Sequence, residues 1–317
     1  MKRNCLLVGG SGFLGLHITQ SLLRAGHKVT VLDRVPPAAG ELKPKFIKGD
    51  YSNKTALVKA LRGQDILFHL AWTTVPASPF DEIEQDTRAN IAGSITLFKL
   101  AAEHGIKKIV FLSSGGTVYG EPARLPVPET APTAPLSSYG IAKLAVEKYL
   151  YLFHHHCGIE YLILRIGNPY GPGQNPERRQ GLIPKLLAHT IAGKPIYVFG
   201  GGKAVRDYIY VSDMASAVTS LIGCGIKNEI INIGSGKGQS VMSVIKAAAK
   251  LTGKKPILIQ KPARDTDVKN NVLDIRKVKK LTRWQPVTSL DMGLTLTLEW
   301  LAGRDESGKP RRAHRHN

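Results

Sequence analysis

The sequence predicts an α/β protein in which a doubly wound parallel sheet is joined to a smaller C-terminal α/β cap. Three observations support this prediction. An apolar, strand-like segment at residues 5–8 runs into three glycines spaced three apart, and a helical pattern follows at once. Strand-like and helical segments then alternate up to about residue 168, the order typical of a parallel sheet with helices on both faces. Beyond residue 173 this alternation stops.

The glycine-rich turn predicts a dinucleotide site. Gly9 permits a tight turn, Gly12 lets the backbone approach a pyrophosphate, and Gly15 lets the helix pack closely on the strand. The helix that begins at Phe13 directs its positive end at the phosphates. Asp33, at the end of the next strand, is placed to accept both ribose hydroxyls of an adenosine. A carboxylate repels a 2′-phosphate, so NAD is favoured over NADP, although the neighbouring Arg34 leaves room for NADP.

The change in pattern divides the chain into expected domains. Residues 1–168 are expected to form the NAD-binding domain, to which residues 206–234 return. Residues 169–205 and 235–302 are expected to form the substrate-binding cap. Residues 303–317 are polar and basic, so we expect a disordered tail there.

Composition narrows the class of protein. The 317 residues are 43% hydrophobic and 21% charged, which suits a globular enzyme, and no apolar run approaches the ~18 residues of a membrane span. Because the N-terminus enters a strand-like segment without an apolar signal region, we expect a cytoplasmic protein without a membrane partner. The three scattered cysteines have neither disulfide nor metal-ligand spacing, so we expect reduced thiols and no metal.

The formal net charge of +20 is the unusual bulk property. Residues 227–283 alone hold fourteen Lys or Arg against four Asp or Glu. Such a field attracts acidic substrates, and equally nucleic acid or an anionic membrane surface. No aromatic-interleaved basic stripe or nucleic-acid module accompanies it, so a solvated basic surface is the simplest interpretation and a nucleic-acid partner is not expected.

Tyr139 and Lys143 form a candidate catalytic pair on a helix predicted to run to about residue 156. Their spacing of four puts both side chains on one helix face. A free tyrosine has a pKa near ~10, so a base at neutral pH requires a stabilised phenolate. We expect the lysine ammonium and the positive nicotinamide ring to lower this pKa together. The hydroxyl-rich strand end at residues 113–117 supports a catalytic rather than a surface pair.

In these residues the chain resembles the extended short-chain dehydrogenase/reductase family, in particular nucleotide-sugar epimerases and dehydratases of the UDP-glucose 4-epimerase type. The resemblance covers about residues 3–302. Its markers are Gly9-x-x-Gly12-x-x-Gly15, Asp33, Gly49-Asp50, His69-Leu70-Ala71, Asn90, Thr117-Val118-Tyr119-Gly120, Tyr139-x-x-x-Lys143, Arg165, Asn168, Gly171-Pro172-Gly173, Arg206-Asp207-Tyr208 and Arg264-x-x-Asp267.

The resemblance implies a Rossmann fold, NAD as cofactor and a UDP-linked nucleotide sugar as substrate. It also implies a homodimer built from two helices per subunit, at about residues 81–104 and 138–156, with contacts at Ile141, Leu144, Ala145 and Leu152. The expected substrate-binding residues are Asn168, Arg206 and Arg264. The expected cofactor-binding residues are Gly9, Gly12, Phe13, Leu14, Gly15, Asp33, Asp50, Tyr51, Leu70, Ala71, Asn90, Ser113, Tyr139 and Lys143.

Two departures from the family pattern bear on the reaction. Gly115 stands where family epimerases carry the Ser or Thr that binds the reacting sugar hydroxyl, so Ser114 or Thr117 must supply it, and we favour Thr117. Gly116-Thr117 lacks the Asp-Glu pair of the dehydratases and the Glu of the decarboxylases, which disfavours both reactions. Thr266 replaces a family glycine near Arg264 and puts the shape of that loop in doubt.

The resemblance therefore favours a nucleotide-sugar 4-epimerase that uses Tyr139 as base and NAD as a transient oxidant. Three alternatives stay open. An NAD(P)-dependent 4-ketosugar reductase shares all of these residues. A regulatory NAD-binding protein needs no Tyr-Lys pair, whereas this chain has one. A nucleic-acid-binding protein would be indicated by binding that weakens steeply with salt.

Overall fold

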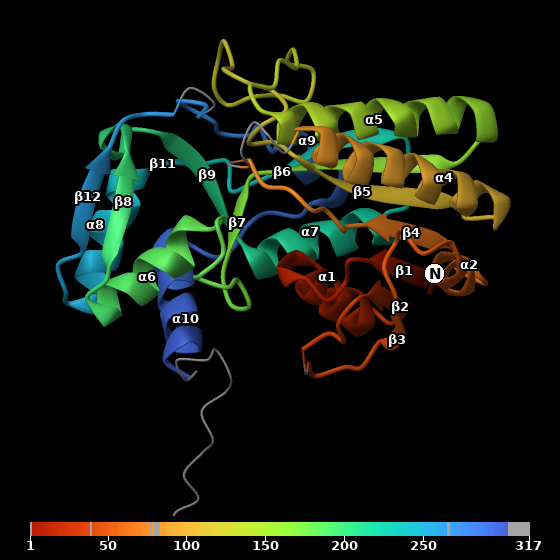
Figure 1. Cartoon of the computed structure of the whole chain (residues 1–317), viewed down its shortest axis with the longest axis horizontal. Helices are drawn as coiled ribbons and strands as arrows, with labels where there is room; N and C mark the ends of the chain where they lie inside the picture. Colours follow the sequence, from red (N-terminus) through yellow and green to blue (C-terminus); the bar gives the residue numbers. More distant parts are fainter. Residues whose placement is uncertain (1, 39, 77, 79–82, 265–266, 304–317) are drawn as a thin grey trace, which may run out of the picture.

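A parallel sheet forms the centre of the larger lobe in the computed structural model, which describes residues 2–38, 40–76, 78, 83–264 and 267–303. The order of its seven described strands is β10-β6-β5-β4-β1-β2-β3, and every neighbouring pair is parallel (Figure 1). The predicted doubly wound fold is confirmed. The strands are β1 (Asn4–Val8), β2 (Lys28–Asp33), β3 (Lys45–Lys48), β4 (Ile66–His69), β5 (Lys108–Ser114), β6 (Glu160–Ile166) and β10 (Glu229–Ile233).

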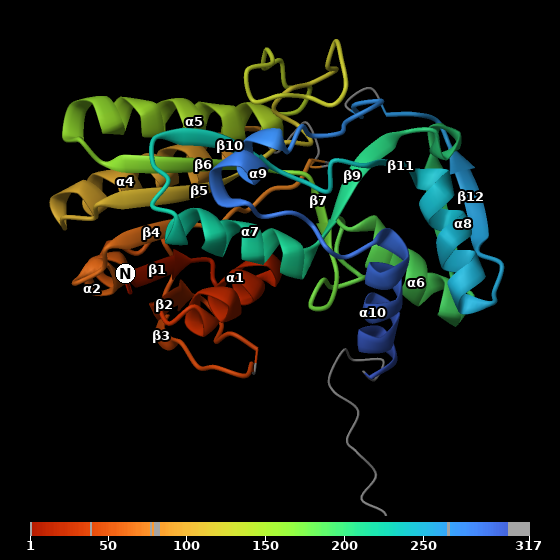
Figure 2. The same cartoon turned by 180° about the vertical axis from the view of Figure 1, so that it is seen from behind.

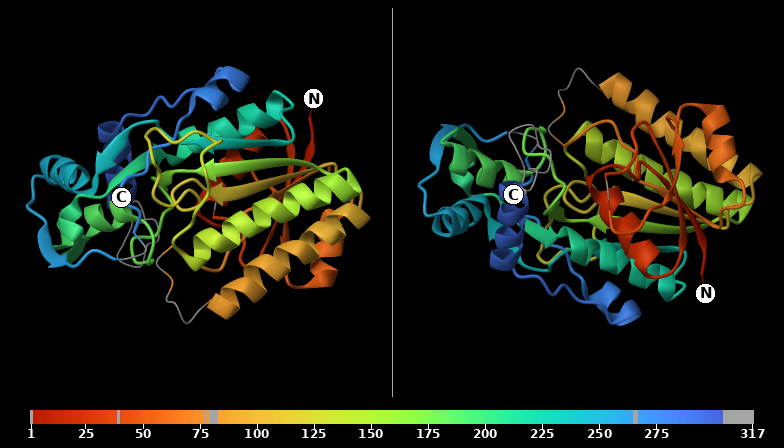
Figure 3. Two further views of the ribbon diagram at one scale, coloured as in Figure 1. Left: turned by 90° about the horizontal axis from the view of Figure 1, so that it is seen from above. Right: turned by 90° about the horizontal axis from the view of Figure 1, so that it is seen from below.

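Helices cover both faces of this sheet, as the view from above in Figure 3 shows. Alternation along β1 directs Cys5 and Leu7 into one apolar cluster and Leu6 and Val8 into the other. All four residues are nearly inaccessible to solvent, which explains why the strand is apolar throughout. On the Leu7 side lie α1 (Phe13–Arg24), α7 (Val211–Gly223) and α9 (Arg276–Thr282); on the Leu6 side lie α2 (Lys54–Leu61), α4 (Gly93–Glu103) and α5 (Ser138–Cys157).

The helix expected at residues 81–104 is not uniform. It consists of α3 (Ile83–Asp86), a π-helical segment η2 (Thr87–Ala92) and α4, and its expected start at Asp81 lies outside the described residues. A π-helical turn widens the helix, and such turns are frequent at functional sites. Here the wider turn carries Asn90, which is buried.

The smaller lobe has its own sheets and apolar core. A three-stranded sheet has the order β11-β9-β7, and a separate parallel pair joins β8 to β12. Helices α6, α8 and α10 pack on these strands (Figure 2). The elements are β7 (Asn168–Tyr170), α6 (Leu182–Ala192), β8 (Pro195–Phe199), the 3-10 turn η3 (Gly200–Gly202), β9 (Val205–Tyr210), β11 (Gly238–Ser240), α8 (Val241–Thr252), β12 (Ile257–Lys261) and α10 (Leu290–Ala302).

The segment 206–234 returns to the larger lobe only in part. α7 and β10 do so, but β9 pairs with β7 and β11 instead of joining the central sheet. Along β9, Arg206 and Tyr208 line the cavity between the lobes, while Asp207 is buried. The wider division into domains stays a prediction, and residues 304–317 of the expected tail lie outside the described residues. Among the described helices, none is long and apolar enough to cross a membrane.

A buried ion pair connects α5 to the central sheet. Arg165 Nη2 on β6 lies 2.7 Å from Glu147 Oε2 on α5, and the two side chains are 3% and 2% exposed. Ser113 on β5 donates its hydroxyl to the same carboxylate. The Arg165 guanidinium also donates to the Glu129 carbonyl and lies 4.7 Å from the centre of the Tyr119 ring. The pair therefore fixes the helix against two neighbouring strands.

We expect Glu147→Gln to lower the free energy of unfolding by ~3–5 kcal/mol, because it leaves the Arg165 guanidinium buried without its counter-charge. The matched control is Glu41→Gln, since Glu41 pairs with Arg24 at side-chain exposures of 66% and 61%. Loss of that exposed pair should cost less than ~1 kcal/mol. Urea denaturation of both variants measures the difference. Equal losses would show that the buried pair does not anchor α5.

Candidate functional site

Two adjoining cavities lie where the carboxyl ends of the central strands face the smaller lobe. One has a volume of ≈ 620 Å³ and is lined in part by Ser11, Gly12 and Phe13; we call it the glycine-side cavity. The other, of ≈ 320 Å³, is the cap-side cavity and is lined by residues of both lobes. Both volumes suit small-molecule ligands. The cavities share four lining residues, Val75, Gln174, Arg179 and Gln180, so they form one continuous site.

The three glycines of the predicted phosphate turn have different surroundings. Gly9 has a φ of 87°, and a Cβ there would lie 2.5 Å from the backbone nitrogen of Ala71. A Cβ on Gly15 would lie 2.5 Å from the carbonyl oxygen of Gly9. At Gly12 the same carbonyl oxygen is the nearest atom, at 3.5 Å. Close contacts within the protein thus require glycine at positions 9 and 15. Gly12 has no such close contact and lines the glycine-side cavity.

Asp33 is held in one orientation at the end of β2. Its Oδ2 accepts a hydrogen bond of 3.0 Å from the backbone nitrogen of Ser11, and its Oδ1 accepts one of 2.7 Å from that of Arg34. Asp50, at the end of β3, lies 3.8 Å from the exposed Arg34 guanidinium. The structure thus brings the predicted acidic residues to the edge that carries the glycine turn, and Leu70 beside Gly9. Leu14 packs on the apolar core behind this turn.

Three predicted cofactor residues have side chains that bind protein groups. Ser113 donates to Glu147, and Tyr51 donates its hydroxyl to the carbonyl of Ala89 in η2. The Asn90 amide is fully engaged in hydrogen bonds within the protein. Direct contacts of these side chains with a cofactor stay predictions. The groups bonded to the Asn90 amide are the backbone nitrogen of Thr73 and the side chains of Thr73, Thr74 and Asp86.

Tyr139 stands on α5, whose first turn is capped by Ser137. Its phenol is hydrogen-bonded to the side chain of Ser114, and its ring meets that of Trp72 edge-on at 6.1 Å. Burial raises the pKa of Tyr139 well above its usual value, the Ser114 hydrogen bond acts against this, and the negative charge of Asp86 adds to it. The protein's own groups therefore hold the phenol protonated, opposite to the expected lowering by Lys143.

Lys143 lies one turn further along the same face of α5. Its ammonium donates a hydrogen bond of 2.7 Å to the Leu112 carbonyl and sits 3.7 Å from the centre of the Trp72 ring. Burial lowers the pKa of Lys143 to about 7, against the opposing effects of Glu147 and Asp86. Both protonation states are thus accessible near neutral pH. The sequence analysis did not name Trp72 as a site residue, although its position in the loop that follows the apolar strand β4 was a usable signal.

Asp86 is a second residue that sequence reasoning missed. Its carboxylate is 1% exposed, and among the described residues it has no cationic ion-pair partner. Its Oδ1 accepts from Thr74 at 2.8 Å and from Asn90, and its Oδ2 accepts from Ser138 at 2.9 Å. Asp86 thus joins the loop after β4, the π-helical segment and the first turn of α5, next to Tyr139.

The missing hydroxyl at Gly115 has a steric cause. A Cβ there would lie 2.7 Å from Cδ1 of Leu273, which fills the space. The neighbouring serines bond to different residues on the same side of α5: Ser113 to Glu147, and Ser114 to Tyr139. Thr117 Oγ1 is buried without a hydrogen-bond partner among the described residues. This geometry favours Ser114 over the Thr117 that the sequence analysis favoured.

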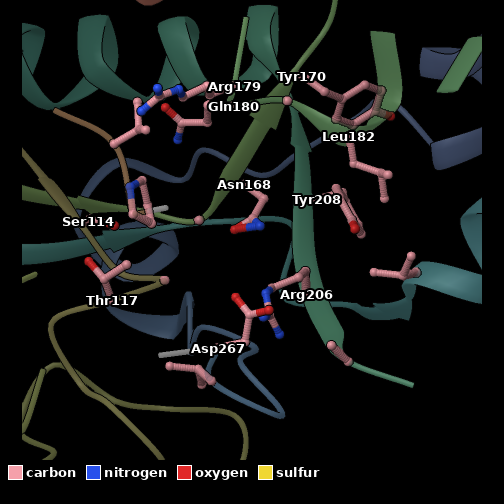
Figure 4. A pocket seen from close by; sticks show the side chains of 18 of the residues that line it. Ser114, Thr117, Asn168, Tyr170, Arg179, Gln180, Leu182, Arg206, Tyr208 and Asp267 are labelled. Carbon is pink, nitrogen blue, oxygen red and sulfur yellow. The ribbon is translucent and has the colours of Figure 1, made fainter. Parts of the chain in front are cut away.

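The three predicted substrate residues line the cap-side cavity together. Figure 4 shows Ser114 and Thr117 on one side, Tyr208 on the other, and Asn168 between them. Arg206 on β9 donates from Nη1 to the carbonyls of Val205 and Lys269 at 2.9 and 3.3 Å. The Arg264 guanidinium lies 3.7 Å from the centre of the Phe199 ring. With Arg179, which lines the same cavity, three arginines therefore stand at a cavity that also holds hydroxyl and amide groups.

Comparison with known proteins agrees with these features. A family model described as the NAD dependent epimerase/dehydratase family matches residues 5–234. The solved UDP-glucose 4-epimerase of Thermotoga maritima, in complex with UDP-glucose, is 34% identical and superimposes with a TM-score of 0.86, covering 94% of this chain and 98% of its own. The Thermus thermophilus UDP-glucose 4-epimerase, in complex with NAD, is 31% identical with a TM-score of 0.85, covering 95% and 99%.

The similarity extends to a different reaction. A dTDP-4-dehydro-6-deoxyglucose reductase of Escherichia coli is 30% identical over 303 residues, which is 92% of this chain and 96% of the reductase. The identities to the epimerases and to the reductase are close to one another. Overall similarity therefore identifies the family and the cofactor, but not the reaction or the sugar.

We expect Asp86→Asn to lower the pKa of Lys143 below its value of about 7, because the Asp86 charge counteracts the effect of burial. Lysine side-chain ¹³C NMR over a pH series measures this, with the resonance assigned by its absence in Lys143→Met. The matched control is Ser138→Ala, which removes the hydrogen bond to Asp86 and keeps the charge. An unchanged titration of Lys143 in Asp86→Asn would contradict an electrostatic role for Asp86.

Proposed function

This chain belongs to the NAD dependent epimerase/dehydratase family, and we propose that it is a nucleotide-sugar 4-epimerase of the UDP-glucose type. The observation that carries the proposal is the hydrogen bond between Tyr139 and Ser114, a residue that lines the cap-side cavity. Gly116 and Thr117 stand where the family's dehydratases and decarboxylases carry acidic residues. The site thus has a candidate base for a hydroxyl but lacks the groups for eliminating water or carbon dioxide.

The glycine-side residues fit NAD. Gly12 keeps its open side toward the cavity, and Asp33 presents an oriented carboxylate at the end of β2. When bound, NAD supplies a hydride acceptor for the sugar carbon and returns the hydride later. We assign the adenosine ribose to Asp33 and the nicotinamide side to Lys143, whose ammonium is near Tyr139.

Tyr139 is assigned as the general base that takes the proton from the sugar's 4-hydroxyl. A protonated Lys143 and the positively charged nicotinamide ring of bound NAD would both favour the phenolate of Tyr139. They would thus offset the burial that raises the pKa of Tyr139. Ser114 is assigned to hold the same sugar oxygen through its hydroxyl. The 4-keto sugar would then turn over so that C4 presents its other face for return of the hydride, and Tyr139 returns the proton to the C4 oxygen.

Such a turnover requires the cap to hold the nucleotide more firmly than the sugar. Arg206 and Arg264 are assigned to the diphosphate, because a guanidinium group can donate two parallel hydrogen bonds to the oxygens of one phosphate. Asn168 is assigned to the sugar side, since its amide oxygen lies beside Gly116. The UDP-glucose bound to the Thermotoga maritima relative supports a UDP-linked substrate.

A 4-ketosugar reductase is the second candidate. The Escherichia coli reductase at 30% identity favours it, and the same Tyr139, Lys143 and Ser114 would serve that reaction in one direction. The two activities differ in the cofactor: an epimerase keeps NAD through its cycle, whereas a reductase must exchange it after every turnover.

We also propose a cytoplasmic homodimer in which α4 and α5 of two subunits form a four-helix bundle. Ile141 and Leu152 on α5 are 55% and 45% exposed, which leaves an apolar face on that helix. Leu144 and Ala145 are only partly exposed on the same helix. The molar mass from light scattering at micromolar concentration measures this, and a monomer would count against it.

The function is tested on the purified full chain. We expect released NAD in the mass spectrum of the denatured protein, and interconversion of UDP-glucose and UDP-galactose without added cofactor. Tyr139→Phe should retain NAD and lose turnover by ~10²–10⁴-fold, because it removes only the hydroxyl of the base. NAD-free protein that consumes NADH or NADPH with a 4-keto sugar would establish the reductase instead.

Ser114→Ala should reduce kcat more than Thr117→Val does, because Ser114 is the side chain bonded to Tyr139. One hydrogen bond contributes ~0.5–1.5 kcal/mol in an ordinary setting, so we expect a loss of roughly tenfold or more where it strengthens in the transition state. Steady-state kinetics of both variants decide between the two hydroxyls. A large loss in Thr117→Val alone would assign the role to the buried, unpartnered Thr117 hydroxyl.

A further inference from the structure

The positive charge of the chain is concentrated on the smaller lobe. Residues 178–206 and 235–264 hold thirteen Lys or Arg and no Asp or Glu, so they account for thirteen of the twenty net charges. The four arginines among them line the two cavities. A role in ligand binding accounts for these arginines but not for the lysines of the same two segments. Eight of those lysines are exposed: Lys194, Lys203, Lys237, Lys246, Lys250, Lys254, Lys255 and Lys261.

Among the described residues, one face of the parallel pair β8 and β12 is largely exposed. Ile196 and Val198 point inward onto the core that α6 and α8 complete. The alternate residues point outward, and Tyr197, Ile257 and Ile259 are 54%, 52% and 36% exposed. Register places Ile259 beside Tyr197. This outward face of β8–β12 is thus an exposed apolar surface on the most basic part of the molecule.

Lysines surround this face at both ends of the strands. Because β8 and β12 are parallel and Pro195 pairs with Ile257, the turns that carry Lys194 and Lys254-Lys255 lie side by side. At the other end, the Lys261 ammonium lies 5.5 Å from the centre of the Tyr197 ring. Among the described residues, none of the eight exposed lysines has a carboxylate ion-pair partner. Their charge is available to an external anion.

We propose that the outward face of β8–β12 docks on an anionic lipid bilayer surface. Isoleucine and tyrosine side chains ringed by lysines match the boundary between acyl chains and anionic headgroups. A second copy of the same face would bring like charges together. Nucleic acid would bind the lysines but leave Ile257 and Ile259 without a role. The proposal revises the expectation of no membrane partner and does not depend on the proposed reaction.

The face is continuous with the functional site, because Tyr197 also lines the cap-side cavity. A protein docked in this way would hold the rim of that cavity at the membrane surface. Helix α2 lies at the opposite end of the molecule, as Figures 1 and 2 show. It carries the exposed Lys54 and Lys59, which offer a charge-matched control far from the proposed face.

Flotation of the full chain with vesicles tests the proposal. We expect binding to vesicles of phosphatidylcholine and phosphatidylglycerol in equal parts, no binding to phosphatidylcholine alone, and weakening with salt. The double variant Lys254→Glu, Lys255→Glu should lose roughly tenfold or more of its vesicle affinity. Ile257→Thr with Ile259→Thr keeps the charge and the β-branched side chains, and should also weaken binding.

The control variant Lys54→Glu, Lys59→Glu should bind vesicles nearly as well as the unchanged chain. Equal losses in the two charge-reversed variants would overturn the proposal, because net charge rather than this face would then decide binding. It would also be overturned if the variants at Ile257 and Ile259 bound normally. Double-stranded DNA that displaces the vesicles, with affinity unaffected by the isoleucine variants, would assign the lysines to nucleic acid instead.

Discussion

The buried pair of Glu147 and Arg165 is the interaction on which the site depends. Tyr139, Lys143 and Glu147 follow one another at intervals of four along α5, so they form one polar stripe that faces the sheet. A helix normally buries an apolar stripe at that position. The stripe is stable because Glu147 is satisfied by Arg165 and Ser113, from two neighbouring strands. Two turns away, the same anchoring fixes the height and rotation of Tyr139.

The charges around Lys143 follow from this arrangement. Its ammonium has Glu147 one turn further along the helix and Asp86 on α3, while the Trp72 ring covers it. Burial and the two carboxylates act in opposite directions, which leaves the pKa of Lys143 at about 7 instead of its ordinary value above 10. The lysine is thus poised between charge states, and small changes in nearby charge alter its protonation.

The sequence predicted the parts of the molecule that depend on local pattern. Strand alternation, the spacing of Gly9 and Gly15, and the i, i+4 pair on α5 are all properties of short segments, and the structure reproduces them. It could not predict contacts that join distant segments. In the sequence Asp86 is one of several acidic residues on a predicted helix, and only the fold brings it to Ser138 at the start of α5. From the sequence, Glu147 is likewise expected to be a solvent-exposed helix residue. Its buried ion pair with Arg165 of β6 becomes evident only in the folded structure.

Gly115 shows most clearly how a distant segment changes the site. Residues 271–273 reach the end of β5: Asn271 donates to the Gly115 carbonyl at 2.9 Å, and Leu273 occupies the space where a side chain at position 115 would lie. The backbone of Leu273 is in turn held by Asp207 at 3.1 Å. In the sequence, Arg264, assigned to the diphosphate, stands nine residues before the Leu273 that fills this space. A serine at that position alone would not restore the family arrangement, because Leu273 would first have to move.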